Sequence, residues 1–224
     1  PFNSPLPFPR VYAVEDTGSE IWLATMGGGL AILDDGGTPA QDDDSWVFHT
    51  EESTGGALLA QTLRDVEFDS SGGAWIATQF GASYLAPDGT WTAFTPDDTG
   101  LGYHHVACVL VDSQDDVWFG TYGRGVSRLQ PDTGLWDVYT RSDGFLGNDF
   151  VTDIEEDADG DVWMAAFHGG GATELRRRLR IPTPPFIGGE LAIELRGDVG
   201  TPTYSVVSLQ AVSYTHLTLP TTRL

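Results

Sequence analysis

The sequence has no lysine, a single cysteine and no long apolar run. All 11 basic residues are arginines, and they stand against 33 Asp and Glu residues, for a formal net charge of −22. The lone cysteine, Cys108, excludes a disulfide within the chain and leaves the compartment open, because many secreted bacterial domains also lack disulfides. No run reaches 18 apolar residues, so no transmembrane helix is expected.

The acidic charge is concentrated in residues 1–175, which hold 30 Asp and Glu against five Arg. A surface of this sign repels nucleic acids and anionic membranes, so neither is an expected partner. Aromatic residues make up 11% of the chain, which separates it from disordered acidic chains. The composition indicates a folded acidic domain, and its small-molecule or glycan ligand is expected to be neutral or cationic.

The two ends of the sequence differ from its middle. It begins PFNSPLPFPR, without Met, so residues 1–10 are expected to be a linker or the end of a preceding repeat in a longer protein. Residues 212–221 can be back-translated into a transposase adapter of short-read sequencing libraries. We interpret residues 212–224 as read-through, with a genuine polar β tail as the alternative, and exclude them from functional argument.

Tryptophans mark an internal repeat, which is sought before motifs. In each copy an Asp lies six residues before a Trp, and a Gly follows that Trp after five or six residues. The marker positions are Trp22, Trp75, Trp118 and Trp163. Three further tryptophans close the first three copies: Trp46, Trp91 and Trp136. Every tryptophan of the chain therefore occupies a repeat position.

Each copy reads as short β-branched or aromatic runs separated by Asp-, Gly- and Ser-rich turns, the pattern of consecutive hairpins. Four such strands at this period are typical of a β-propeller blade. We predict an all-β fold, a propeller fragment of about four four-stranded blades. The predicted blades lie near residues 11–61, 62–105, 106–150 and 151–175, and the last is partial because RRRLRIPTPP replaces its closing strand.

The sequence changes character after the repeats. Residues 176–186 combine the arginine cluster RRRLR with PTPP and are predicted to form a stiff linker, with a positive surface patch as the alternative for RRRLR. Residues 187–211 alternate like strands and are predicted to start a second β module that is then truncated. The fragment is therefore expected to contact the rest of its own longer chain.

The acidic segment DADGD, residues 157–161, has two interpretations: a hairpin turn or a calcium loop. Its counterparts in the other copies, such as DSQDD, share the leading Asp, which stabilises a turn by bonding backbone two residues on. A calcium loop needs a further bidentate carboxylate about seven residues past the core, where this chain has apolar residues 162–165. The turn is favoured, and no metal site is predicted.

A more specific pattern recurs in TGLGYHHVACVLVDSQDDVWFGTYGRGV and GFLGNDFVTDIEEDADGDVWMAAFHGG. It resembles the two-component regulator propeller repeat, and the resemblance covers about residues 11–175. It implies a propeller that serves as an extracytoplasmic sensor module, periplasmic or secreted, ahead of a membrane-linked histidine kinase. Streptogramin lyases have similar repeats. The first copy departs from the pattern through an insertion at residues 34–45, and the fourth lacks the closing Trp.

Candidate ligand-binding residues lie on two sets of loops that a propeller places on one face: those after the Trp strand and those between blades. Mixed aromatic and polar groups on such loops are typical of binding sites. The candidates are Phe80, Tyr103, His104, His105, Tyr122, Arg124, Phe167 and His168. The histidines are expected to converge near the propeller axis, the alternative being that they are structural or solvated.

Three functions are compatible with the sequence. The favoured one is a non-catalytic sensor or ligand-binding propeller, without cofactor, from an extracytoplasmic bacterial protein. The second is an enzyme resembling the streptogramin lyases, which would need His104, His105 or His168 as a metal-assisted general base. The third is a structural cell-surface repeat protein. No nucleophile, zinc or phosphate-loop motif is present.

Overall fold

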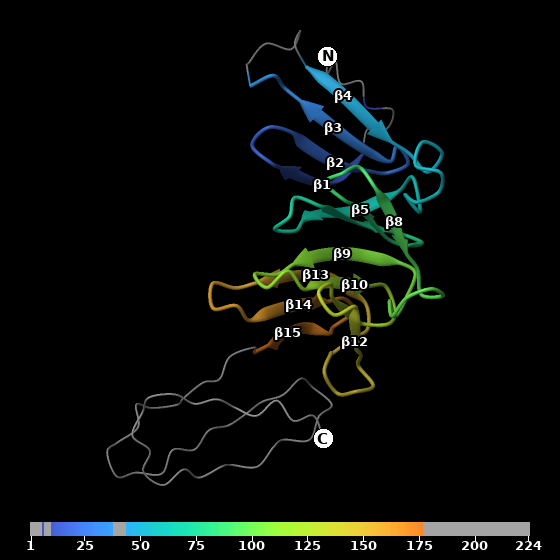
Figure 1. Ribbon diagram of the computed structural model, residues 1–224. Helices are drawn as coiled ribbons and strands as arrows, with labels where there is room; N and C mark the ends of the chain where they lie inside the picture. The colour runs from blue at the N-terminus through green and yellow to red at the C-terminus, as the bar shows by residue number, and fades with distance from the viewer. Residues whose placement is uncertain (1–5, 7–9, 38–43, 177–224) are drawn as a thin grey trace, which may run out of the picture. The chain divides into compact units, whose positions relative to one another are not determined.

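The computed structural model describes residues 6, 10–37 and 44–176, in which all regular secondary structure is β (Figure 1). These residues form three four-stranded antiparallel sheets and one three-stranded sheet, in which each strand pairs with the next along the chain. The all-β propeller prediction is confirmed. The predicted linker beyond Arg176, the β module 187–211 and the adapter-like residues 212–224 lie outside the described residues.

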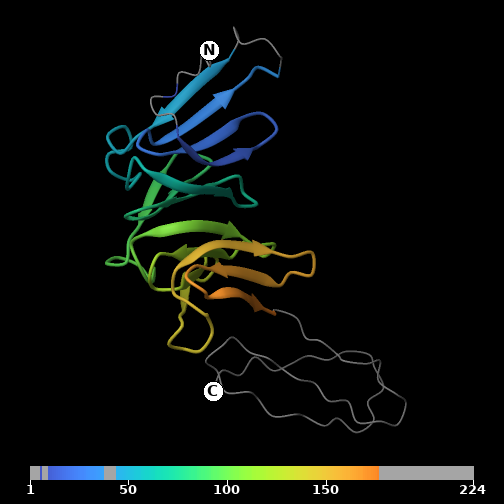
Figure 2. The same ribbon diagram turned by 180° about the vertical axis from the view of Figure 1, so that it is seen from behind.

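Each sheet is one blade, and its strands follow in chain order (Figures 1 and 2). Blade 1 contains β1 (Val11–Asp16), β2 (Ile21–Thr25), β3 (Leu30–Asp34) and β4 (Ser45–His49). Blade 2 contains β5 (Leu63–Phe68), β6 (Ala74–Thr78), β7 (Gly81–Leu85) and β8 (Trp91–Phe94). Blade 3 contains β9 (Val106–Val111), β10 (Val117–Thr121), β11 (Val126–Gln130) and β12 (Leu135–Tyr139). Blade 4 contains β13 (Val151–Glu156), β14 (Val162–Ala166) and β15 (Gly171–Leu175).

The DADGD segment is the hairpin turn between β13 and β14, as predicted. Asp157 Oδ1 accepts hydrogen bonds from the backbone N–H groups of Asp159 at 2.9 Å and Asp161 at 3.0 Å. Its Oδ2 accepts the indole N–H of Trp163 at 2.9 Å. The same Asp therefore closes the turn and fixes the Trp six residues later, which explains the spacing seen in the sequence.

The marker tryptophans lie on the second strand of each blade and, in blades 1 to 3, pack against the next blade. Trp22 shares a core with Leu63 and Ile76 of blade 2. Trp75 packs in the core that contains Val106 and Phe119 of blade 3. In the third interface, Trp118 shares a core with Val151, Ile154 and Met164. Each of these three interfaces thus buries one large aromatic side chain, which explains why the position is Trp in every copy.

The first strands of successive blades are neighbours, with β1 beside β5, β5 beside β9 and β9 beside β13. All four have the same irregularity, a register shift after their first residue. Such a bulge re-aims the extra side chain. The extra residues are Tyr12, Arg64, Ala107 and Thr152. Cys108 follows one of these bulges and is buried.

Candidate functional site

Antiparallel pairing places the loops between blades at the same end of the sheets as the turns after each second strand. We call this end the loop face. Neighbouring blades are joined there by backbone hydrogen bonds. Gly27 N and Gly29 N of blade 1 donate to Gln61 O at 2.8 and 2.9 Å. Gly123 N and Gly125 N of blade 3 both donate to Asp149 O at 3.0 Å. These bonds fix the loops that bear the predicted site residues.

A buried threonine anchors the loop-face turn in the first three blades. Thr25 Oγ1 donates to Gly29 O at 2.7 Å, and Thr121 Oγ1 donates to Gly125 O at 2.8 Å. Thr78 makes the corresponding bond to Gly81. Blade 4 has Ala166 in this place, and its turn holds His168 with a φ of 50°, a left-handed conformation uncommon for residues other than glycine.

Five aromatic or imidazole rings form a continuous series across the loop ends of blades 3 and 4. We call His105, Tyr122, Phe150, His168 and Phe167 the aromatic series. Its ring centroids are separated, in that order, by 4.6, 6.3, 5.8 and 4.4 Å. Backbone bonds support it, since Tyr122 N donates to His105 O and Phe167 N donates to Phe150 O.

The series continues to blades 1 and 2 through an arginine. The guanidinium carbon of Arg64 lies 5.9 Å from the ring centroid of Tyr122 and 4.7 Å from that of Tyr12. Tyr12 OH in turn lies 3.5 Å from the sulfur of Met26. Side chains from all four blades therefore meet in one connected set of contacts.

Two polar atoms in this set are buried without a hydrogen-bond partner, Arg64 Nε and His105 Nε2. Burial lowers the pKa of His105, and the nearby charges of Arg64 and His104 lower it further. The imidazole of His105 is therefore neutral at neutral pH. Buried polar atoms without partners are rare in proteins, so this is the chemically least satisfied part of the loop face.

The structure brings together some of the predicted residues and leaves others apart. His105, Tyr122, Phe167 and His168 belong to the aromatic series, in which His105 and His168 are linked through Tyr122 and Phe150 and not by direct ring contact. His105 and His168, which were expected to converge, are therefore connected through other rings and do not contact each other.

The other predicted residues lie outside the series. Tyr103 and His104 form a separate pair at 4.2 Å, and His104 is exposed. Phe80 is 55% exposed and makes no ring contact with any described residue. Arg124 lies in the turn after β10, where its backbone N–H donates to Thr121 Oγ1 at 3.1 Å.

Sequence reasoning missed Tyr12, Arg64 and Phe150. Phe150 lies immediately before β13, in the position that His105 occupies before β9, so alignment of the repeats had the signal to find it. Tyr12 and Arg64 are bulge residues within strands. Simple alternation along a strand does not predict a bulge, so their place in this contact set had no local sequence signal.

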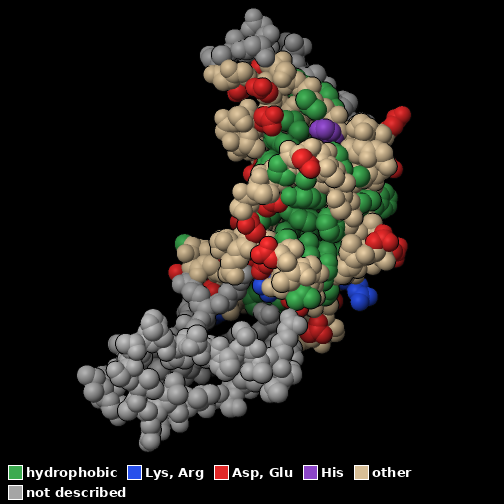
Figure 3. Space-filling model, in the orientation of Figure 1, with side chains coloured by type: hydrophobic (Ala, Val, Ile, Leu, Met, Phe, Trp, Pro, Cys, Tyr) green, Lys and Arg blue, Asp and Glu red, His purple; other side chains and the backbone are tan. Residues whose placement is uncertain are grey.

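Away from the loop face, the first strands of the blades carry a group of closely spaced carboxylates. Burial raises the pKa of Asp65 to about 6, and the charges of Asp153 and Glu15 raise it as well. Burial and the neighbouring charges of Glu15, Asp65 and Glu155 raise the pKa of Glu67 to about 7. Red acidic side chains are scattered over the blades in Figure 3, whereas blue basic ones are sparse.

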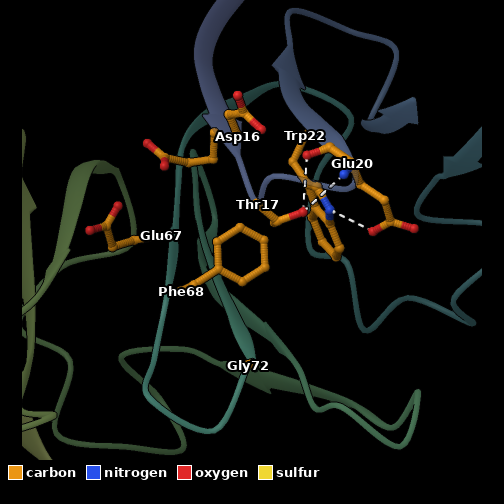
Figure 4. A pocket seen from close by; sticks show the side chains of 8 residues that line it. Asp16, Thr17, Glu20, Trp22, Glu67, Phe68 and Gly72 are labelled. Carbon is orange, nitrogen blue, oxygen red and sulfur yellow. Dashed lines mark hydrogen bonds between the residues drawn. The ribbon is translucent and has the colours of Figure 1, made fainter. Parts of the chain in front are cut away.

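A cleft of about 520 Å³ lies between the first hairpin turns of blades 1 and 2, at the end opposite the loop face (Figure 4). Its lining includes Glu15, Glu20, Glu67 and the edge-to-face pair Trp22 and Phe68. The corresponding turns of later blades are bonded together instead. Ser70 N and Oγ donate to Asp115, and Ser113 N and Oγ donate to Glu156.

None of the predicted ligand-binding residues lines this cleft. Within residues 6, 10–37 and 44–176, the side chains close enough to hold a metal together are Asp157, Asp161 and Glu174. Asp157 holds its own turn and the Trp163 indole, and Glu174 pairs with Arg176 at 2.8 Å. This carboxylate group contains no histidine, so it differs from the histidine set that a lyase would use.

Comparison with known proteins supports the sequence resemblance. Residues 100–123 and 137–168 match the family described as two component regulator propeller. No curated protein matches the sequence. Among the described strands and loops, no helix is long and apolar enough to cross a membrane.

Several solved structures share the fold at low sequence identity. The extracellular domain of the hybrid two component system BT3049 from B. thetaiotaomicron superposes with a TM-score of 0.61 at 15% identity, over 83% of this chain and 26% of that one. PorZ, a surface component of the type-IX secretion system of Porphyromonas gingivalis, gives 0.58 at 17% identity over 75% and 26%. Virginiamycin B lyase from Staphylococcus aureus gives 0.52 at 15% identity over 80% and 59%.

The chain thus spans about a quarter of the first two of these proteins and well under two thirds of the third. At these identities the likeness concerns the fold, which is a propeller in each case. The sequence match adds the repeat type. Taken together, the repeat spacing, the blades and the family match place repeats similar to the two component regulator propeller type in residues 100–123 and 137–168 of this chain.

Proposed function

We propose that the chain is a non-catalytic, ligand-binding propeller module of a larger extracytoplasmic sensor protein. The ligand is a small molecule or glycan, and it binds on the loop face. Support for the sensor context comes from the matched repeat family and from the fold shared with the extracellular domain of a hybrid two component system. The rest of the longer chain would transmit the signal.

The aromatic series is the observation that carries this proposal. Its rings come from loops of two neighbouring blades, and Phe167 and Phe150 are 56% and 41% exposed. Exposed aromatic faces on rigid loops stack on sugar rings and apolar groups at low entropic cost. A purely structural repeat has no need for large exposed rings at one end of its blades.

The test is binding of a panel of neutral sugars, acidic sugars and small organic amines, measured by titration calorimetry on the 224-residue chain. We expect Tyr122→Ala to weaken binding of the active compounds about tenfold or more, because the stacked ring is lost. Leu135→Ala removes a side chain that is also exposed, 42% in its case, but from the outer strand β12. This control should bind like the parent chain.

The two alternative functions give different results. A structural repeat protein would bind none of the panel in a Tyr122-dependent manner. A lyase would show metal-dependent turnover of a cyclic ester that is lost in His105→Ala or His168→Ala, with binding nearly intact, because general-base catalysis typically contributes roughly 10²–10⁴ in rate. Either result would contradict the proposal.

A further inference from the structure

Arg64 differs in its ionic contacts from Arg128 and Arg176, the two described arginines that pair with carboxylates. Arg128 Nε lies 3.1 Å from Asp116 Oδ2, and Arg176 lies 2.8 Å from Glu174. The Arg64 guanidinium has no such carboxylate partner among the described residues, and its Nε is buried without a hydrogen bond. In a chain with 33 acidic residues, a guanidinium in the candidate site that has no ion pair with any described residue requires an explanation.

The carboxylate nearest to Arg64 in the chain is already occupied. Asp65 Oδ1 accepts the backbone N–H of Val66 at 3.0 Å, and its Oδ2 accepts that of Val109 at 3.0 Å. The register of β5 on β6 shifts between Leu63 and Asp65, which makes Arg64 the extra residue of the bulge. Asp65 is thus used to join β5 to β9, and no ion pair between Asp65 and Arg64 is found among the described residues.

Aromatic rings hold the guanidinium in place. Its carbon lies over the ring of Tyr12 and near that of Tyr122. A guanidinium that stacks on aromatic faces keeps the N–H groups along its edge available, and these match the two oxygens of a carboxylate. The second buried atom without a partner, Nε2 of His105, lies on the ring that contacts Tyr122 edge-on.

We propose that Arg64 binds the carboxylate of an acidic sugar whose ring stacks on Tyr122. This assignment rests on the proposed function of the loop face and names the ligand class for it. It also changes the expectation drawn from net charge. Repulsion by distant surface carboxylates is screened beyond about 8 Å at physiological ionic strength, whereas a charge-assisted contact with a held guanidinium acts at hydrogen-bond distance.

The experiment compares D-glucuronate and D-galacturonate with D-glucose and D-galactose by titration calorimetry at physiological ionic strength. We expect the acidic sugars to bind at least tenfold more tightly than their neutral counterparts. Arg64→Gln should reduce uronate affinity roughly 10- to 100-fold, the range for a lost hydrogen-bonded charge contact, and should reduce neutral-sugar affinity by a much smaller factor. The matched control is Arg141→Gln, which removes an exposed arginine from the loop between β12 and β13 and should bind uronates normally.

Folding is checked by the thermal melting curve of each variant. If Arg64→Gln does not fold, Arg64→Lys replaces it; this change keeps the charge but loses the planar fork, and we expect uronate affinity to fall at least threefold. Equal binding of acidic and neutral sugars, or unchanged uronate binding in the folded Arg64 variant, would overturn the inference. Neutral-sugar or amine binding that requires Tyr122 but not Arg64 would overturn it and leave the proposed function standing. Absence of Tyr122-dependent binding for every probe would contradict both.

Discussion

Trp118 and Trp163 occupy the same position in successive blades, yet their surroundings differ. Each donates its indole N–H to the Asp six residues earlier, Trp118 to Asp112 at 2.6 Å and Trp163 to Asp157 at 2.9 Å. Trp118 is 0% exposed, whereas Trp163 is 40% exposed. The local structure is therefore the same, and the burial is not.

The difference lies in what each tryptophan packs against. Trp118 contacts a core that β13 and β14 of the next blade complete. Trp163 lies on blade 4, the last described blade. A blade thus builds its own hairpins and turn bonds but relies on its neighbour for much of its apolar burial, as expected for a protein whose repeats contact only adjacent repeats.

The largest difference in stability is expected when each indole is removed by substitution with Ala. Trp118→Ala should lower the free energy of unfolding by about 3–5 kcal/mol, because it leaves a cavity in a filled interface. Trp163→Ala should cost about 1 kcal/mol. Thermal and urea unfolding of both variants provide the measurement. Equal losses would show that the indoles contribute through their own blade and not through the interface.

Removing the Asp that accepts each indole N–H should lower the free energy of unfolding by a smaller amount, again more in blade 3 than in blade 4. Asp112 is buried and accepts N–H groups of Gln114, Asp116 and Trp118. Asp112→Ala leaves these donors unpaired and should cost about 2–3 kcal/mol. Asp157→Ala exposes the corresponding donors of blade 4 more readily to water and should cost about 1 kcal/mol. Urea unfolding of both variants measures the two losses of stability. A larger loss for Asp157→Ala than for Asp112→Ala would contradict the comparison.

The smallest expected effect concerns Glu67, one of the closely spaced carboxylates on the first strands of the blades. Its pKa is raised from 4.5 to about 7, so between these values the folded state binds more protons than the unfolded chain. Stability from this group is therefore highest at acid pH and declines as the pH rises through about 7. The pKa of Asp65, raised to about 6, acts in the same direction.

Glu67→Gln should accordingly stabilise the chain at pH 8 and change little at pH 4. Because Glu67 is partly solvated and its charge is screened, we expect a gain on the order of 1 kcal/mol, or about 2–4 °C in the midpoint of thermal unfolding. The control is Glu51→Gln in an exposed loop, which should have no pH-dependent effect. An equal gain for Glu67→Gln at both pH values would rule out the ionisation as its cause.

Much of the blade structure was predictable because its signals are local. The Asp of each first turn bonds backbone a few residues on, and the strand runs between turns are short and regular. Trp75 shows a limit of that rule. Its indole nitrogen is buried without a partner, because Asp69 Oδ2 accepts the hydroxyl of Tyr84 instead. The repeat spacing alone did not reveal this exchange.

The candidate site was predictable only in part. Tyr122 and His105 follow from the position of their loops in the repeat, and the contact between them depends on the distance between loop ends. Arg64 lies inside a strand, and its approach to Tyr12 of blade 1 and Tyr122 of blade 3 joins residues more than 50 positions apart. Such a contact depends on how three blades are arranged, which no pattern within one repeat contains.

The repeat period, the strand order, the turn chemistry and the acidic surface were all encoded locally, through hydrogen bonds and side-chain alternation within about 50 residues of chain. Packing between blades settled the rest: which tryptophan is buried, which carboxylates crowd together on the first strands of the blades, and which arginine has no ion pair among the described residues. The physical reason is that burial, dielectric environment and ion pairing depend on atoms brought from other repeats, and repeats with the same spacing pattern therefore acquire different chemistry from different neighbours.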